Sequence, residues 1–136
     1  MSTRLNPYIS FDATAREAMQ FYQQVFGGEL AMNTFGEFGQ QGTPHENLIM
    51  HAALETPSGY TLMGADTPPG MDRQPGWTVQ LIVNGDDEAE LRGYWNALAD
   101  GATIDTPLEQ QMWGDQYGQL TDKFGIIWMF NISSPQ

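Results

Sequence analysis

The stretch EAMQFYQQVFGGE at residues 17–29 is the most informative part of the sequence, because it contains most of an amphipathic helix and the start of the strand that follows it. Thr14 and Glu17 form a capping-box pattern, which predicts that the helix begins directly after Thr14. The pair Gly27 and Gly28 supplies the left-handed residues that commonly stop a helix, which predicts an end near Phe26. Between these limits the apolar residues recur at helical spacing and form one stripe: Ala18, Phe21, Tyr22, Val25 and Phe26.

The same pattern returns later in the chain. Gly101 follows Gly28 by 101 − 28 = 73 residues, and an aromatic pair at 94–95 follows the pair at 21–22 by the same interval, 94 − 21 = 73. Asp87 opens the second helix pattern as a capping residue. A strand-like run precedes each helix, at residues 6–11 and 77–83. The sequence therefore contains an internal repeat.

Three strand-like runs follow each helix, at residues 29–35, 47–56 and 60–65 and again at 102–108, 116–121 and 126–132. Each copy is thus a βαβββ module, and the fold class is α+β. One helix covers only one face of a four-stranded sheet, so we expect the two modules to pair and form a curved mixed-sheet cleft. We expect a single domain over residues 1–136, with module one at about 5–66, a linker at about 67–76 and module two at about 77–133.

Side-chain alternation along the first strand of each module predicts which residues face the cleft. Ile9, Phe11, Val79, Leu81 and Val83 would face the helices, and the cleft side would carry Tyr8, Ser10, Thr78, Gln80 and Ile82. The Gly-rich run at 36–44, followed by His45, is a candidate lid.

Charge and composition exclude several partners. Seventeen acidic and five basic residues give a net charge of −12, which repels nucleic-acid phosphates and anionic lipid head groups. The chain has no cysteine, which removes disulfides and thiolate ligands. No signal segment and no run of about 18 apolar residues is present, so we expect a cytoplasmic protein with neither nucleic-acid nor membrane partners.

Several runs resemble the PhnB-like branch of the vicinal-oxygen-chelate (glyoxalase/bleomycin-resistance/dioxygenase) superfamily. They are FYQQVFGGE at 21–29, WGDQYG at 113–118 and TDKFGIIW at 121–128, within a resemblance that covers nearly the whole chain. The resemblance implies paired βαβββ modules, a homodimer, and a small-molecule cleft that in superfamily enzymes holds a divalent metal.

The resemblance also implies where metal ligands would lie, on the first and last strands of each module. In this sequence those places fall near Asn6, Leu62, Thr78 and Trp128. None of the four is a strong ligand for a divalent ion, since such a site needs His, Gln or Glu side chains. We therefore expect no metal at the standard positions.

A few residues could still carry chemistry. His51 corresponds to Tyr117 in the second copy, 117 − 51 = 66, and could act as a base or ligand, or else as a structural histidine within a sheet. Glu109, near Trp113, could have its pKa raised by desolvation, or be an exposed carboxylate. Trp113, Tyr117 and Trp128 could form flat walls for a planar ligand or pack in the core.

Asp122 has a structural prediction instead: it is expected to be the turn residue that joins the last two strands.

Two functions follow. The first is a small-molecule-binding protein that has lost the standard metal ligands. The second is a metal-dependent isomerase, lyase or dioxygenase-like enzyme with a displaced site around His51 and Glu109, aided by Gln80, for which a divalent metal would be the cofactor. An S-adenosylmethionine-dependent methyltransferase, a label attached to some similar sequences, is disfavoured because neither half contains a Gly-rich strand-to-helix nucleotide loop.

Overall fold

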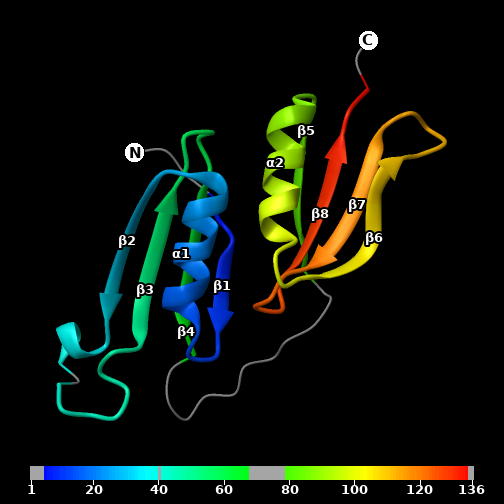
Figure 1. Ribbon diagram of the computed structural model, residues 1–136. Helices are drawn as coiled ribbons and strands as arrows, with labels where there is room; N and C mark the ends of the chain where they lie inside the picture. Colours follow the sequence, from blue (N-terminus) through cyan, green and yellow to red (C-terminus); the bar gives the residue numbers. More distant parts are fainter. Residues whose placement is uncertain (1–4, 40, 68–78, 135–136) are drawn as a thin grey trace. The chain divides into compact units, whose positions relative to one another are not determined.

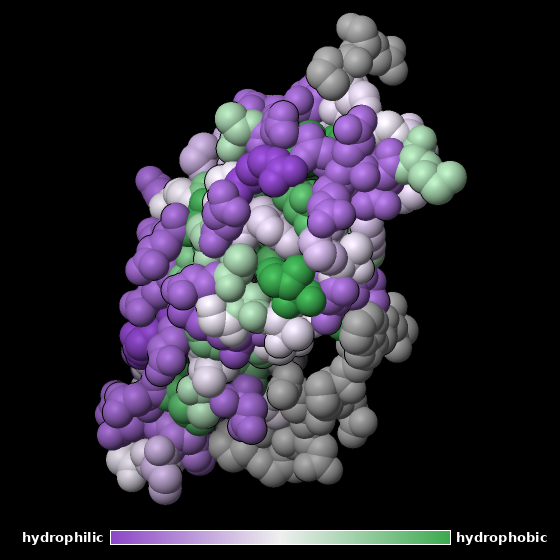
Figure 2. Space-filling model, turned by 45° about the vertical axis from the view of Figure 1, so that its right-hand side comes forward, coloured by the Kyte–Doolittle hydropathy of each residue, from purple (hydrophilic) through white to green (hydrophobic). Residues whose placement is uncertain are grey.

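The computed structural model describes residues 5–39, 41–67 and 79–134. These residues form two compact units, and each unit is a mixed four-stranded sheet with one long helix (Figure 1). Figure 2 shows that hydrophilic side chains cover much of the visible surface, with hydrophobic residues between them. Within the described ranges, no helix combines the length and the apolar character needed to cross a bilayer.

The first unit contains β1 (Tyr8–Phe11), α1 (Ala15–Phe26), β2 (Glu29–Thr34), the short 3-10 helix η1 (Gly36–Phe38), β3 (Ile49–Glu55) and β4 (Thr61–Asp66). Its strands lie in the order β1-β4-β3-β2. β1 runs parallel to β4, while β3 is antiparallel to both of its neighbours.

The second unit repeats this order with β5 (Leu81–Gly85), α2 (Glu88–Leu98), β6 (Thr103–Gln110), β7 (Gln116–Thr121) and β8 (Ile127–Ile132). Its strands lie in the order β5-β8-β7-β6, and again only the first and last strands of the module are parallel. The predicted α+β fold built from two βαβββ modules is therefore confirmed.

The core of the first unit lies between α1 and one face of its sheet. Tyr22 on α1 and Leu54 on β3 are fully buried, and Phe11 is 1% exposed. Burying each such side chain contributes about 1.5–3 kcal/mol. Every residue of the predicted apolar stripe of α1 is buried. This apolar face is therefore the one that packs against the sheet.

The N-terminus of α1 differs from its predicted form. Thr14 precedes the helix, but its side chain makes no capping hydrogen bond. The first helical amide, the N–H of Ala15, instead donates to the carboxylate of Asp66 at 2.9 Å. Asp66 is 3% exposed and also accepts the N–H of Ile49 at 2.8 Å, so this one carboxylate joins the ends of α1, β3 and β4. The capping-box prediction is wrong here because a residue far along the chain supplies the acceptor.

The second helix begins as predicted, since the Asp87 side chain accepts the N–H of Glu90 at 3.1 Å. Trp95 of α2 packs edge-on against Phe130 of β8, with 5.4 Å between the ring centres. β5 begins at Leu81, later than the start of the strand-like run expected at 77–83. Val79 lies before the strand and is 80% exposed, so the expectation that it faces the helix is wrong. The strand pairing explains this, because β5 first pairs with β8 at Leu81 and Trp128.

Candidate functional site

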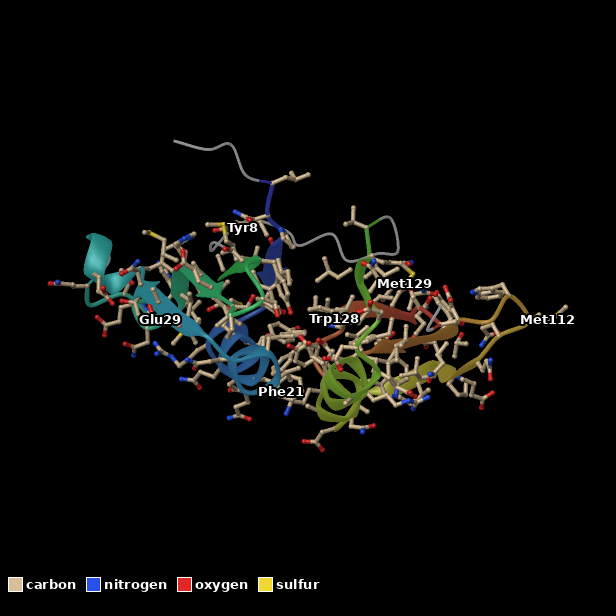
Figure 3. All side chains as sticks on the ribbon, turned by 90° about the horizontal axis from the view of Figure 1, so that it is seen from above. Tyr8, Phe21, Glu29, Met112, Trp128 and Met129 are labelled. Carbon is tan, nitrogen blue, oxygen red and sulfur yellow. The ribbon has the colours of Figure 1, made fainter. Side chains whose placement is uncertain are left out.

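The face of the first sheet that lies away from α1 is the first candidate surface, which we call the first open face. Alternation defines it, because Ala52 and Leu54 are fully buried on the helix side while the residues between and beside them point the other way. Figure 3 shows Tyr8 on the side of this sheet opposite α1 and Phe21. Tyr8 and Ser10 are exposed there, as their alternation predicted.

Two of the residues singled out in the sequence are neighbours on this face. The rings of Tyr8 and His51 are stacked, with centres 5.9 Å apart and planes inclined by 30°. Asn33 of β2 is the direct pairing partner of His51, and the amide nitrogen of Asn6 lies 3.9 Å from the sulfur of Met63. Aromatic and amide groups therefore gather beside a polarizable thioether, an environment that suits a flat organic group with polar edges.

The corresponding face of the second sheet, away from α2, is the second open face. One row of direct pairing partners crosses all four strands of this sheet: Glu109 with Tyr117, Tyr117 with Asn131, and Asn131 with Asn84. Neighbouring strands lie about 4.8 Å apart, so the row is roughly 14 Å long. Within the described part of the chain, neither the Glu109 carboxylate nor the Tyr117 hydroxyl has an intramolecular hydrogen-bond partner.

An apolar strip lies beside this row on the same face. Ile82 of β5 pairs with Met129 of β8, and Met129 pairs with Gln119 of β7. Ile82 is 52% exposed, and Figure 3 shows Met129 on the side of the sheet away from α2. The second open face thus offers hydrogen-bonding groups in one row and, in the next row, apolar side chains on β5 and β8.

Asn131 is held in one orientation by Asp115. Its amide NH2 donates to Asp115 Oδ2 at 3.1 Å, while the N–H of Ser134 donates to Asp115 Oδ1 at 3.0 Å. The hydrogen bonds from Asn131 and then from Ser134 lower the pKa of Asp115 below its ordinary value of 3.8. Because an ionised carboxylate can only accept, Asn131 must turn its NH2 toward Asp115, which leaves its carbonyl oxygen as an acceptor elsewhere.

The pairing of strands shows which residues of the two copies are equivalent. Tyr8 pairs with Met63, and Ile82 pairs with Met129, so Tyr8 corresponds to Ile82. By the same comparison Ser10 corresponds to Asn84. Sequence reasoning alone does not single out Asn84 or Asn131. The interval of 66 residues that relates His51 to Tyr117 also relates position 65 to Asn131, and this signal points to Asn131.

The remaining sequence candidates lie elsewhere in the second unit. Trp113 is 65% exposed beside the fully exposed Met112, in the turn that joins β6 to β7. Gln80 directly precedes β5.

Trp128 is 2% exposed, and its indole N–H donates to Asp122 Oδ2 at 2.9 Å. Asp122 Oδ1 accepts the N–H groups of Phe124 and Ile126, which confirms Asp122 as the residue that closes the β7–β8 turn.

Two of the standard metal places hold residues that do not fit a divalent ion. Leu62 and Trp128 are buried on the helix sides of their sheets, so the neighbours that face the open sides are Met63 and Met129. A thioether is a poor ligand for the hard divalent ions that oxygen and nitrogen donors bind. Thr78 lies outside the described residues. In the described ranges, no three His, Asp or Glu side chains are grouped so that they could hold a metal.

The loop proposed as a lid has hydrogen bonds of its own. The N–H of Gly36 donates to the carbonyl of Glu46 at 2.9 Å, and the Glu46 carboxylate accepts the N–H of Gly42 at 2.8 Å. The His45 ring packs edge-on against the buried ring of Phe35. His45 therefore anchors the end of this loop to the first unit.

Comparison with known proteins assigns the family. The model of the Glyoxalase/Bleomycin resistance protein/Dioxygenase superfamily matches residues 4–130. The chain belongs to this superfamily. Protein YjdN of Escherichia coli is 26% identical over 97% of both chains, and an uncharacterized protein of Mycobacterium bovis, Mb0911c, is 35% identical over 91% of this chain and 79% of its own.

Solved structures share the fold of this chain. The crystal structure of protein PA1353 from Pseudomonas aeruginosa is 34% identical, covers 98% of this chain and 100% of its own, and gives a TM-score of 0.87. A PhnB protein from Bacillus cereus, titled a putative 3-demethylubiquinone-9 3-methyltransferase, is 23% identical over 96% of this chain and 100% of its own, with a TM-score of 0.75. The PhnB-like resemblance seen in the sequence is thus confirmed at the level of the fold.

Proposed function

We propose that this member of the glyoxalase/bleomycin resistance superfamily is a binding protein for a small organic molecule, which it takes up on its two open faces. The main support for the proposal is the row Glu109, Tyr117, Asn131 and Asn84, because four polar side chains in direct register cross the sheet face that lies away from α2. The stacked pair of Tyr8 and His51 supports the same role for the first open face.

The proposed ligand-binding residues follow from this placement. Tyr8, Ser10 and His51 would act on the first open face, and Gln80, Glu109 and Tyr117 on or beside the second. Trp113, in the β6–β7 turn, would contact ligand only at the edge of that face. Trp128 is left out of the set, because its ring is buried on the helix side and its N–H is already bound to Asp122.

No contact among the described residues favours the metal-dependent enzyme. His51 is in register with the amide of Asn33, and Glu109 is in register with the phenol of Tyr117, so neither has a further carboxylate or imidazole as its pairing partner. Binding is therefore the function that the two faces support.

A thermal-shift screen against a library of metabolites and antibiotics tests the proposal. Hits are expected to lose their stabilising effect in His51→Ala or Tyr117→Ala, because those side chains lie within the proposed surfaces. Gln20→Ala and Asn96→Ala, at exposed positions on α1 and α2, are the matched controls and should respond like the unmodified protein. Hits that persist equally in all four variants would place binding elsewhere and overturn the proposal.

The assembly and location of the protein are part of the proposal. We propose a cytoplasmic homodimer, because two-fold assembly is the commonest oligomeric form of soluble proteins and the superfamily resemblance implies it. Sedimentation equilibrium at micromolar concentration should give twice the mass of the chain. A single species of monomer mass over the whole concentration range would contradict the dimer.

A further inference from the structure

We infer that the second open face binds a linear polyamine, lying across the strands along the row from Glu109 to Asn84. The inference rests on the proposed function, since it names the ligand class for one of the two proposed surfaces. Three observations support it: the hydrogen-bond acceptors in the row, the spacing of these acceptors, and the negative net charge of the chain.

The row presents acceptors at three successive strands. Glu109 offers a carboxylate on β6, and Tyr117 offers a phenolic oxygen on β7. Asn131 offers its carbonyl oxygen on β8, because its NH2 group is already engaged by Asp115. A ligand that satisfies all three must supply donors at three places, and protonated amines donate without accepting.

The spacing of these acceptors fits amines joined by short methylene chains. Adjacent strands lie about 4.8 Å apart. From ordinary bond lengths, amines separated by three or four carbons stand roughly 5–6 Å apart when extended. Spermidine, with three amines and both kinds of spacer, can therefore place one amine at each of Glu109, Tyr117 and Asn131.

The apolar strip beside the row accommodates the remainder of such a ligand. Ile82 and Met129 lie in register on the same face, two residues along their strands from Asn84 and Asn131. Methylene groups between the amines can pack against these side chains, as apolar surface is removed from water. Inorganic cations have no group that would use this strip.

The charge of the chain favours the same ligand. The net charge of −12 attracts polycations at long range, and Glu109 provides the one carboxylate in the row that carries no intramolecular hydrogen bond in the described residues. Asp115 adds a second negative charge behind Asn131, and the lowered pKa keeps that carboxylate ionised at neutral pH.

Isothermal titration with spermidine at low ionic strength tests the inference on the full chain. We expect one site per chain, with affinity reduced at least about tenfold in Glu109→Gln, equivalent to about 1.4 kcal/mol. Asn131→Leu, which removes the acceptor at the third strand, should weaken binding similarly. Glu17→Gln, at an exposed position on α1, changes the net charge equally and should leave the affinity within about twofold.

Two further titrations separate the outcomes. Putrescine, with two amines, should bind more weakly than spermidine, and magnesium should neither bind at the row nor compete at equal concentration. Equal weakening in Glu109→Gln and Glu17→Gln would show diffuse charge attraction and overturn the polyamine site. If spermidine does not bind, but other compounds from the screen bind the unmodified protein and not Tyr117→Ala, the proposed ligand class is wrong and the proposed binding function stands.

Discussion

Gly28 lies so close to the backbone of Glu55 that a Cβ atom on Gly28 would stand 2.0 Å from the Glu55 carbonyl oxygen. Gly28 also has a φ of +104°, which side-chain-bearing residues rarely adopt. We expect Gly28→Ala to lower the free energy of unfolding by at least about 3 kcal/mol, because backbone strain and a backbone clash combine. Urea denaturation measures the change.

Gly59 provides the matched control for that variant. Its φ is +96°, but nothing lies within 4 Å of the place its Cβ would take. Gly59→Ala should therefore cost only the left-handed backbone penalty, about 1 kcal/mol. Equal losses in the two variants would mean that the contact with Glu55 adds nothing.

Because the Asp66 carboxylate accepts the first amide of α1, we expect the variants Asp66→Ala and Thr14→Ala to differ in stability. Asp66→Ala leaves two buried amides, those of Ala15 and Ile49, without an acceptor, and should destabilise the protein by about 2–4 kcal/mol. Thr14→Ala should change stability by less than about 0.5 kcal/mol, since the Thr14 side chain caps nothing. A loss near 1 kcal/mol in Thr14→Ala, the usual effect of removing a cap, would contradict the observed arrangement.

Glu29 and Glu55 are direct pairing partners on β2 and β3, and both are exposed. Like charges in directly opposite positions repel, so Glu55→Lys should stabilise the protein by about 0.2–1 kcal/mol. The gain should shrink in 1 M salt, where surface charges are screened. The double variant Glu29→Lys with Glu55→Lys restores a like-charged pair and should lose the gain, whereas an unchanged gain would rule out the pairwise effect.

Asp115 predicts a specific dependence of stability on pH. Its folded-state pKa is lowered, chiefly by the hydrogen bond from Asn131, so its contribution to stability is present above the ordinary value of 3.8 and is lost as the pH falls through the lower folded value. The difference in unfolding free energy between the unmodified protein and Asp115→Asn should be constant near neutral pH and shrink in acid. A difference that grows as the pH falls would contradict the sign of this shift.

The carboxyl titration of Asp115 can also be followed directly by NMR. Asn131→Ala removes the largest cause of the shift, so the pKa of Asp115 should rise toward its ordinary value in that variant. Ser134 still donates its backbone N–H, and part of the lowering should therefore remain.

The helices could be predicted because their signals are local, and the repeat could be predicted because this local pattern occurs twice. The apolar stripe of α1 and the glycines that follow it lie within a few residues of each other, and the observed end at Phe26 matches the predicted one. The acceptor for the first amide of α1 could not be predicted in this way. Asp66 becomes a neighbour of Ala15 only through the parallel pairing of β1 with β4.

The open faces show the limit of sequence reasoning more sharply. Side chains alternate along a strand, so an error of one residue moves a position to the opposite face. Sequence register points to Leu62 and Trp128 as the standard ligand places, yet the residues that face the open sides are their neighbours Met63 and Met129. Asn131 gained its importance only when the pairing placed it between Tyr117 and Asn84.

The equivalence of Ser10 with Asn84 and of Tyr8 with Ile82 has an evolutionary consequence. An assembly of identical half-length chains would be obliged to carry the same side chain at every symmetric position. When both halves lie in one polypeptide, equivalent positions can carry different side chains, because a substitution in one half does not change the other. A duplicated scaffold of this kind can therefore specialise each half for a different part of an asymmetric molecule.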